Sequence, residues 1–152
     1  MPKILQASDT INGRLGQVSV ELDGRRIEVM ELENITATVN KNKSEFRTIG
    51  TLNTQNKATG WSGSGSATVR YISSRWGKLM EKYAHDHVDT YFTIDIINED
   101  PGSATGKQAV QLLGCNFDSI DIAKLDINAD ELTQDINFTF DDFNFLTTFN
   151  EI

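Results

Sequence analysis

The chain has 152 residues, of which 38% are hydrophobic and 24% charged, and its formal net charge is −8. A single domain of this length buries about two-thirds of the surface that its unfolded chain exposes, so it needs no covalent staples. Cys115 is the one cysteine, which excludes an internal disulfide and favours synthesis in a reducing compartment. No window approaches the roughly 20 apolar residues of a membrane helix. The first ten residues lack the apolar run of a signal peptide, so we expect a chain made in the cytosol.

The charge is distributed unevenly along the chain. Residues 1–85 carry +4 and residues 86–152 carry −12. Two differently solvated faces would explain this asymmetry. A polarised subunit, whose positive part contacts the negative part of the next copy, would explain it as well, and such head-to-tail contacts generate rings or filaments.

Alternation of apolar and polar residues dominates the first part of the chain and predicts strands. The first strand ends at Asp23-Gly24, a dipeptide that favours a tight hairpin. The apolar residues that share one face of each early strand are Val18, Val20 and Leu22, then Ile35, Ala37 and Val39, and then Ala67, Val69 and Tyr71.

Residues 41–60, KNKSEFRTIGTLNTQNKATG, interrupt these strands and show no apolar periodicity. Unstructured connections longer than about 12–15 residues are uncommon in compact domains unless they bind a partner or are disordered. The segment carries +3 in an acidic protein. We therefore predict an extended assembly loop at about 41–60 that becomes ordered only against neighbouring subunits. The residues predicted for this subunit interface are Lys41, Asn42, Lys43, Ser44, Glu45, Phe46 and Arg47.

The next segment, Ser73–His87, has the periodicity of a helix instead of a strand. Its apolar residues recur at helical spacing, and Ser73 or Ser74 is available as the N-cap. We predict one amphipathic helix that covers an open side of the sheet. The apolar face of this helix comprises Trp76, Leu79, Met80 and Tyr83.

Strand patterns return after the helix. They are interrupted by a turn-rich loop, Glu99–Gly106, and together with the early strands they number about eight. This count predicts a mainly β fold, a single-domain barrel or sandwich over residues 1–152. The later predicted strands are Thr90–Ile97, Ala109–Gly114, Phe117–Ile127 with a bulge near Ala123-Lys124, and Asp135–Phe140.

No pattern in the chain predicts catalysis or a cofactor. His85 and His87 flank Asp86, but residues two apart on a helix do not share a face, and a third ligand at metal-site spacing is missing. The glycine-rich stretch Gly60–Ser66 lacks the Lys-Ser/Thr ending of a phosphate-binding loop. Its glycines instead predict the start of a strand whose backbone the helix or a neighbouring chain approaches closely. The carboxylates of the C-terminal half read as one solvated sheet face. We predict neither an enzyme nor a metal site.

Four segments, in this order, resemble the tail tube proteins of contractile-tailed bacteriophages and of defective prophages of Gram-positive bacteria, the group that includes the core tail protein of prophage PBSX. The likeness spans nearly the whole chain. The segments are SDTINGRLGQVSVELDG, NKSE, TGWSGSGSATVRYISSRW and INFTFDDF.

The resemblance implies a small β-barrel or sandwich with one helix, whose copies form hexameric rings that stack into a hollow tube inside a contractile sheath. It implies a virion structural protein, assembled in the host bacterial cytoplasm, with tail sheath, tape-measure and baseplate proteins as partners. DNA would pass along the lumen without specific binding, and no cofactor or membrane is expected. Charge alone suggests that the basic loop meets an acidic neighbour, or that acidic residues line the lumen, and the residues considered are Asp135, Asp141, Asp142 and Phe143.

Two other functions remain open at this point. One is a ring-forming tube protein of a secretion or injection system that carries cargo in its pore. The other is a stand-alone ligand-binding β-barrel, which would be monomeric and contain an apolar pocket.

Overall fold

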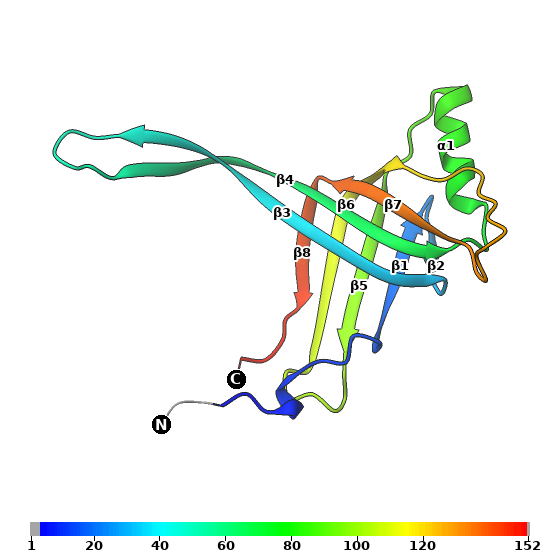
Figure 1. Ribbon diagram of the computed structural model, residues 1–152, viewed down its shortest axis with the longest axis horizontal. Coiled ribbons are helices and arrows are strands. Elements are labelled where there is room, and N and C mark those ends of the chain that lie inside the picture. The colour runs from blue at the N-terminus through cyan, green and yellow to red at the C-terminus, as the bar shows by residue number, and fades with distance from the viewer. Residues whose placement is uncertain (1–3, 152) are drawn as a thin grey trace.

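The computed structural model describes residues 4–151, which form eight strands, one α-helix and one short 3-10 helix (Figure 1). The mainly β fold with a single amphipathic helix is therefore confirmed. The elements are η1 (Ala7–Asp9), β1 (Gly16–Leu22), β2 (Arg25–Glu28), β3 (Leu32–Arg47), β4 (Thr54–Arg70), α1 (Arg75–Asp86), β5 (Phe92–Glu99), β6 (Lys107–Ser119), β7 (Thr133–Phe140) and β8 (Asp142–Thr147).

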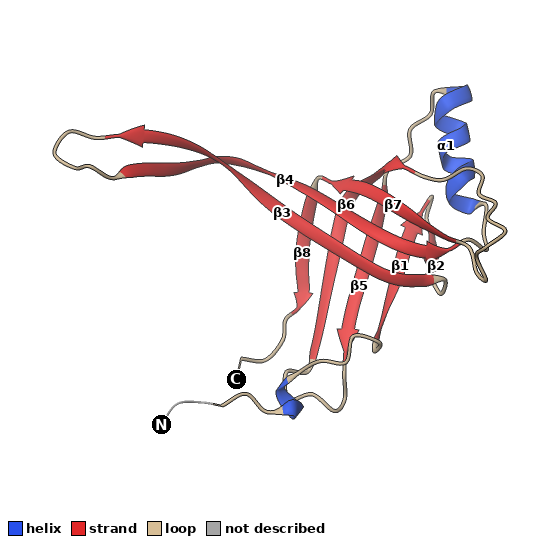
Figure 2. Cartoon of the chain, in the orientation of Figure 1, coloured by secondary structure: helices blue, strands red, loops and turns tan. Residues whose placement is uncertain are grey.

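The strands form one antiparallel sheet in the order β2-β1-β5-β6-β7-β4-β3, with β8 added beside β6. The first part of β6 pairs with β5 and β8, and its last part pairs with β7. Gly114 lies close to this change of partner, just before Cys115, and has φ +65°, a conformation that L side chains rarely adopt. The sheet bends at this point, so that its two halves cross face to face (Figure 2). Within residues 4–151 the edge strands β2 and β3 each pair with one neighbour, so the sandwich is open rather than closed into a barrel.

The core lies between the two halves of the sheet. Alternation places every second residue of β7 inward, so that Ile136, Phe138 and Phe140 are buried while the residues between them are exposed. Asp23 and Gly24 both have positive φ and join β1 to β2, as the dipeptide predicts. The other buried apolar residues of this core are Val18, Val20, Val29, Val69, Trp76, Phe92, Ile94, Leu112 and Cys115.

Two glycines of β4 make room for aromatic rings of β7. Gly63 lies opposite Phe140 and Gly65 lies opposite Phe138, and each ring covers the glycine that it faces. The glycine-rich stretch is therefore the middle of a strand and not its start, and the close approach comes from rings of the neighbouring strand.

We expect Gly65→Ala to lower the free energy of unfolding by about 1–3 kcal/mol, as overpacking of a core does. A Cβ at this position would lie 2.4 Å from the Phe138 ring and 2.7 Å from the Thr36 carbonyl oxygen. Gly60→Ala is the matched control, because a Cβ on that β4 glycine meets no atom within 4 Å. Urea denaturation of both variants measures the difference, and equal stabilities would contradict this packing.

Two strand predictions were wrong. The predicted strand Phe117–Ile127 is not a separate strand: β6 continues through Gly114 and includes its first three residues, up to Ser119, and residues 120–132 form a loop. Ile120 packs against the core, but the following apolar residues of that loop, Ile122, Leu125 and Ile127, are exposed. Conversely, β8 was not predicted, although Phe143 and Phe145 alternate with Asp142 and Asn144 at its start.

The helix is present where it was predicted, but it does not cover an open side of the sheet. It stands at one end of the sandwich (Figure 1), where Trp76 is its one residue classed as buried. The Trp76 ring meets the Phe117 ring edge-on, with 5.6 Å between the ring centroids. The Phe117 ring in turn has its centroid 4.6 Å from that of Phe92. Helix α1 is thus anchored to the core through a short aromatic chain.

Candidate assembly surfaces

The β3–β4 hairpin extends far beyond the body of the sandwich (Figure 1). β4 pairs with β7 only between Gly63 and Arg70, whereas β3 and β4 continue to pair with each other out to Arg47 and Thr54. Most of the segment at 41–60 is therefore paired strand, and the expectation of an unstructured loop was wrong. The sequence did not reveal these strands because both of their faces are exposed, so no apolar alternation is needed.

The seven predicted interface residues alternate between the two faces of this hairpin. All seven are exposed, and the basic residues lie on one face while Phe46 lies on the other. The turn at residues 48–53 carries Ile49 and Leu52, whose side chains are fully exposed at the tip. Among the described residues no salt bridge involves Lys41, Lys43, Arg47 or Lys57, the cations of the outer part of the hairpin. The face of the basic residues comprises Lys41, Lys43 and Arg47 together with Glu45, and the other face comprises Asn42, Ser44 and Phe46.

Aromatic residues hold the root of the hairpin. Trp61 on β4 meets Phe143 on β8 edge-on at 5.6 Å, and Phe143 also contacts Phe140 and Phe145. Phe143, which we considered with the acidic interface, is therefore half-buried inside the subunit. It links the hairpin to β8, which belongs to the half of the sheet that contains β1 and β5.

The three acidic residues that we considered with Phe143 do not form one surface. Asp135 lies near the start of β7, where its Oδ1 accepts a hydrogen bond from Thr68 Oγ1 at 2.7 Å. Asp141 and Asp142 lie beyond the other end of β7, near the hairpin root. The idea that the C-terminal carboxylates share one sheet face was also wrong, since four of them lie in the loop at residues 120–132.

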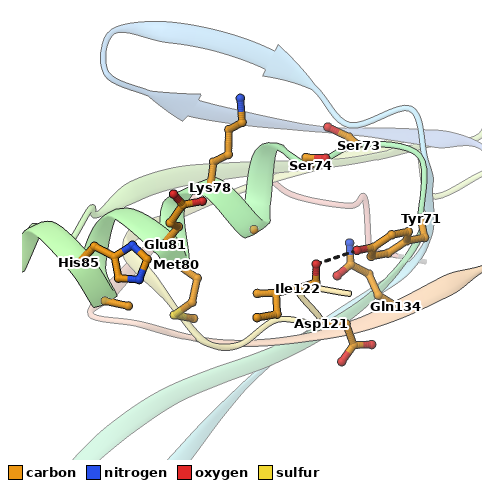
Figure 3. A pocket seen from close by; sticks show the side chains of 12 residues that line it. Tyr71, Ser73, Ser74, Lys78, Met80, Glu81, His85, Asp121, Ile122 and Gln134 are labelled. Atoms are coloured by element: carbon orange, nitrogen blue, oxygen red, sulfur yellow. Dashed lines mark hydrogen bonds between the residues drawn. The ribbon is translucent and has the colours of Figure 1, made fainter. Parts of the chain in front are cut away.

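A groove lies at the opposite end of the molecule, between α1 and the loop at residues 120–132. It has a volume of about 460 Å³ (Figure 3). Met80 of the helix and Ile122 of the loop line it, and the Tyr71 hydroxyl donates to the Ile122 carbonyl at 3.0 Å. Gln134 also lines the groove; it is 2% exposed, and its Oε1 accepts no hydrogen bond from the described residues. Sequence reasoning missed this groove because it interpreted the loop as a strand.

The outer face of the β3-β4-β7 part of the sheet carries mainly hydroxyl and amide groups. Along each strand these residues alternate with residues that face the core. Two charged residues of β4 and β7 share this face: Asp135 is hydrogen bonded to Thr68, and Arg70, at the end of β4, forms salt bridges with Glu33 and Glu131. The uncharged side chains of this polar face are Thr36, Thr38, Asn40, Ser62, Ser64, Ser66, Thr68, Asn137 and Thr139.

A family model described as "Phage tail tube protein" matches residues 3–147. The chain belongs to the phage tail tube protein family. It is 38% identical over 140 residues to the phage-like element PBSX protein XkdM of Bacillus subtilis (strain 168), covering 92% of each chain. The resemblance on which the fold was predicted is thereby confirmed, and the family is a structural one.

Solved structures share the fold of this tail tube protein. A chain of the sheath–tube complex of the PVC extracellular contractile injection system, in its extended state, matches with a TM-score of 0.70 at 14% identity and covers 93% of this chain and 95% of that one. A chain from the tail of an empty gene transfer agent particle, refined with C6 symmetry, matches with a TM-score of 0.62 at 14% identity. The match covers 91% of this chain and 100% of that one.

Neither a cluster of metal ligands nor a membrane helix stands out in the part of this tail tube protein that the structure describes. Within residues 4–151 no three His, Cys, Asp or Glu side chains are grouped closely enough to hold a metal ion. His87 adopts a left-handed conformation and ends α1, with its N–H donating to the Tyr83 carbonyl. No helix among the described residues is long and apolar enough to cross a membrane.

Cys115 is a core residue and not a nucleophile. Its side chain is fully buried, and burial raises the pKa of the thiol from 9.0 to about 12. The thiolate, which is the reactive species, is therefore disfavoured in the folded subunit.

We expect Cys115 to resist iodoacetamide at pH 8 in the folded tail tube protein and to react fully in denaturant, with labelling measured by mass spectrometry. Because the folded pKa lies above the unfolded one, the contribution of the neutral thiol to stability is complete below pH 9 and is lost as the pH rises toward 12. Cys115→Ala should remove that part of the alkaline destabilisation. Rapid labelling of the native protein at pH 8 would contradict a buried thiol.

Proposed function

We propose that this chain is the repeating subunit of a tail tube, forming hexameric rings that stack inside a contractile sheath in the tail of a virion or related particle. The observation that carries the proposal is the β3–β4 hairpin. Its outer part leaves the sheet, exposes Ile49 and Leu52 at the tip and finds no partner elsewhere in the described chain. An exposed two-stranded ribbon is marginally stable in water by itself, which supports a role in contacting another subunit.

The neighbouring structures support the architecture of this assembly. One was solved as a sheath–tube complex and another in a tail with C6 symmetry. We propose the corresponding partners for this chain: copies of itself, a tail sheath, and tape-measure and baseplate proteins, with assembly in the bacterial cytoplasm.

The interior of the subunit argues against a stand-alone ligand-binding barrel. Aromatic and branched side chains fill the space between the two halves of the sheet and leave a cavity of about 40 Å³. Small-molecule pockets occupy roughly 300–1,000 Å³. A pore formed between subunits, and not a pocket inside one, is the space in which DNA or another cargo would travel.

We propose that the polar face of β3, β4 and β7 lines that pore. Its hydroxyl and amide groups supply no cations, and the charge of Arg70 at its end is paired with Glu33 and Glu131. Affinity for DNA comes largely from Lys and Arg that neutralise phosphates. Asp135 is the acidic residue that this arrangement would place on the wall, whereas Asp141 and Asp142 would lie near one rim. DNA would then slide along a neutral, hydrated surface.

Lysines introduced on this face should convert the tube into a DNA-binding tube. We expect Ser64→Lys with Asn137→Lys to retain duplex DNA at 50 mM salt and to release it as salt rises, because phosphate neutralisation is lost with added counterions. Wild-type tubes should retain no DNA, and Lys substitutions at Glu21 and Glu28, on the other half of the sheet, provide the control. Salt-sensitive DNA binding by wild-type tubes would contradict the proposed lumen.

Electron microscopy of the concentrated protein tests the assembly itself. We expect a subunit that is monomeric or weakly associated when dilute and that forms six-fold rings or tubes when concentrated or when given an initiating complex. Sedimentation measures the association in parallel. A strictly monomeric protein at millimolar concentration, without rings in micrographs, would contradict the proposed function.

A further inference from the structure

We propose that the hairpin tip of one subunit docks in the groove between α1 and the loop at residues 120–132 of another copy. The inference deepens the proposed function, on which it rests, by naming the receiving surface. The tip and the groove lie at opposite ends of the molecule (Figure 1), so that a single subunit cannot satisfy the contact by itself. The contact is therefore head-to-tail and can repeat from copy to copy.

Apolar side chains are exposed on both surfaces. At the tip, Ile49 and Leu52 are fully exposed, and on the loop Leu125 and Ile127 are more than 95% exposed. Ile122, at the edge of the groove, is also largely exposed. Clusters of exposed apolar residues on a soluble subunit mark sites of interaction, and burying Leu and Ile side chains favours association.

Charge is complementary across the same two surfaces. Residues 41–60 carry +3, and residues 120–132 carry −3. Among the described residues, the loop carboxylates Asp121, Asp126 and Asp130 make no salt bridge, and neither do the cations of residues 41–60; Glu131 of the loop pairs with Arg70 of its own subunit. Opposite potentials on two faces steer their encounter and fix their register.

The groove also offers an unused hydrogen-bond acceptor. Gln134 is 2% exposed, yet its Oε1 has no donor among the described residues (Figure 3 shows its place beside Tyr71). A buried acceptor without a partner is costly, so a donor from an incoming segment would be favoured there. The tip turn is rich in such donors, since Thr48, Gly50 and Thr51 carry backbone N–H groups outside any strand.

Disulfide trapping tests the docking without requiring tubes. We expect Leu52→Cys combined with Leu125→Cys to give a ladder of covalent multimers when the protein is concentrated under mild oxidation. Each single variant should give no ladder, because the contact joins a tip to a loop, and native Cys115 is buried and silent. Leu52→Cys with Asp142→Cys is the matched control, since it places the second thiol near the hairpin root. Ladders from the control pair, or none from the Leu125 pair, would overturn the inference.

Charge reversal supplies an independent readout. Lys41→Glu, Lys43→Glu and Arg47→Glu together should raise the concentration needed for assembly at least tenfold, and so should Asp121→Lys, Asp126→Lys and Asp130→Lys. The two sets combined should restore assembly toward the wild-type concentration. Rescue by Asp141→Lys and Asp142→Lys in place of the loop set would overturn the inference in favour of the other acidic surface.

Failure of the inference and failure of the proposed function give different results. Wild-type tubes that form while both the loop reversal and the Leu125 pair have no effect would refute the docking and leave the tail tube function standing. Covalent ladders without any ring or tube would support the docking and refute the proposed function. Neither ladders nor tubes would refute both.

Discussion

Removing the outer part of the β3–β4 hairpin is expected to abolish tube growth while leaving the subunit folded. Lys43 and Ala58 are directly paired, so replacing residues 44–57 by Asn-Gly joins them through the tight turn that a two-residue hairpin favours. The free energy of unfolding should change by no more than about 0.5 kcal/mol, because the removed residues contribute nothing to the core. Microscopy and urea denaturation measure the two effects.

Glu21→Thr with Glu28→Thr is the control for this truncation. Both exposed positions lie on β1 and β2, away from the hairpin, and threonine favours strands, so this variant should build tubes normally. Hydrogen exchange gives a complementary view: amides at residues 42–60 should exchange faster than those at 63–70 in the dilute subunit and gain protection in tubes, since β7 supports only the inner part. Normal tubes from the truncated variant would refute an assembly role for the hairpin.

Trp76→Ala is expected to lower the free energy of unfolding by about 3–5 kcal/mol, the range for removing a large aromatic side chain from a core. Trp76 is 3% exposed and connects α1 to the core through Phe117, so its loss should also detach the helix. Circular dichroism during urea denaturation measures both the stability and the lost helical signal.

Trp76→Phe is the matched variant. It keeps an aromatic ring against Phe117 and removes the indole Nε1, which is buried without an acceptor among the described residues. Because no hydrogen bond is lost, the destabilisation should stay below about 1.5 kcal/mol, as for core substitutions of similar shape. A loss of less than about 1 kcal/mol in Trp76→Ala would mean that α1 does not depend on this anchor.

Sequence reasoning succeeded where local chemistry and burial agree. Asp23-Gly24 predicted its hairpin because few other dipeptides accept two positive φ angles. Helix α1 was predicted because Trp76 and its apolar neighbours share one helical face. Ile136, Phe138 and Phe140 predicted β7 because one face of that strand is buried.

The errors occurred where the alternation of apolar residues does not correspond to burial within the subunit. The outer hairpin is strand without an apolar face, because no other segment of residues 4–151 covers it. The loop at residues 120–132 has an alternating apolar pattern without being strand, since Ile122, Leu125 and Ile127 remain exposed. Patterns of alternation report burial inside the chain, and they mislead where side chains are left for a partner.

The candidate surfaces were only partly accessible to the sequence. The basic residues of the hairpin were identified from charge, but the tip residues Ile49 and Leu52 were not included among them. The groove joins α1, Tyr71 and Gln134 with a loop distant in sequence, and no local motif signals such a juxtaposition.

The length of β4 has a mechanical consequence. The strand is continuous from the free ribbon into its ladder with β7, which extends from Gly63 to Arg70. A pull on a docked tip along the strand would therefore load that ladder in shear, and its backbone hydrogen bonds would resist together instead of opening one after another. Aromatic packing of Trp61 against Phe143 would pass part of the load to β8, in the half of the sheet that contains β1 and β5. A column built from such subunits could stay intact during a rapid power stroke, although each ribbon is only marginally stable by itself.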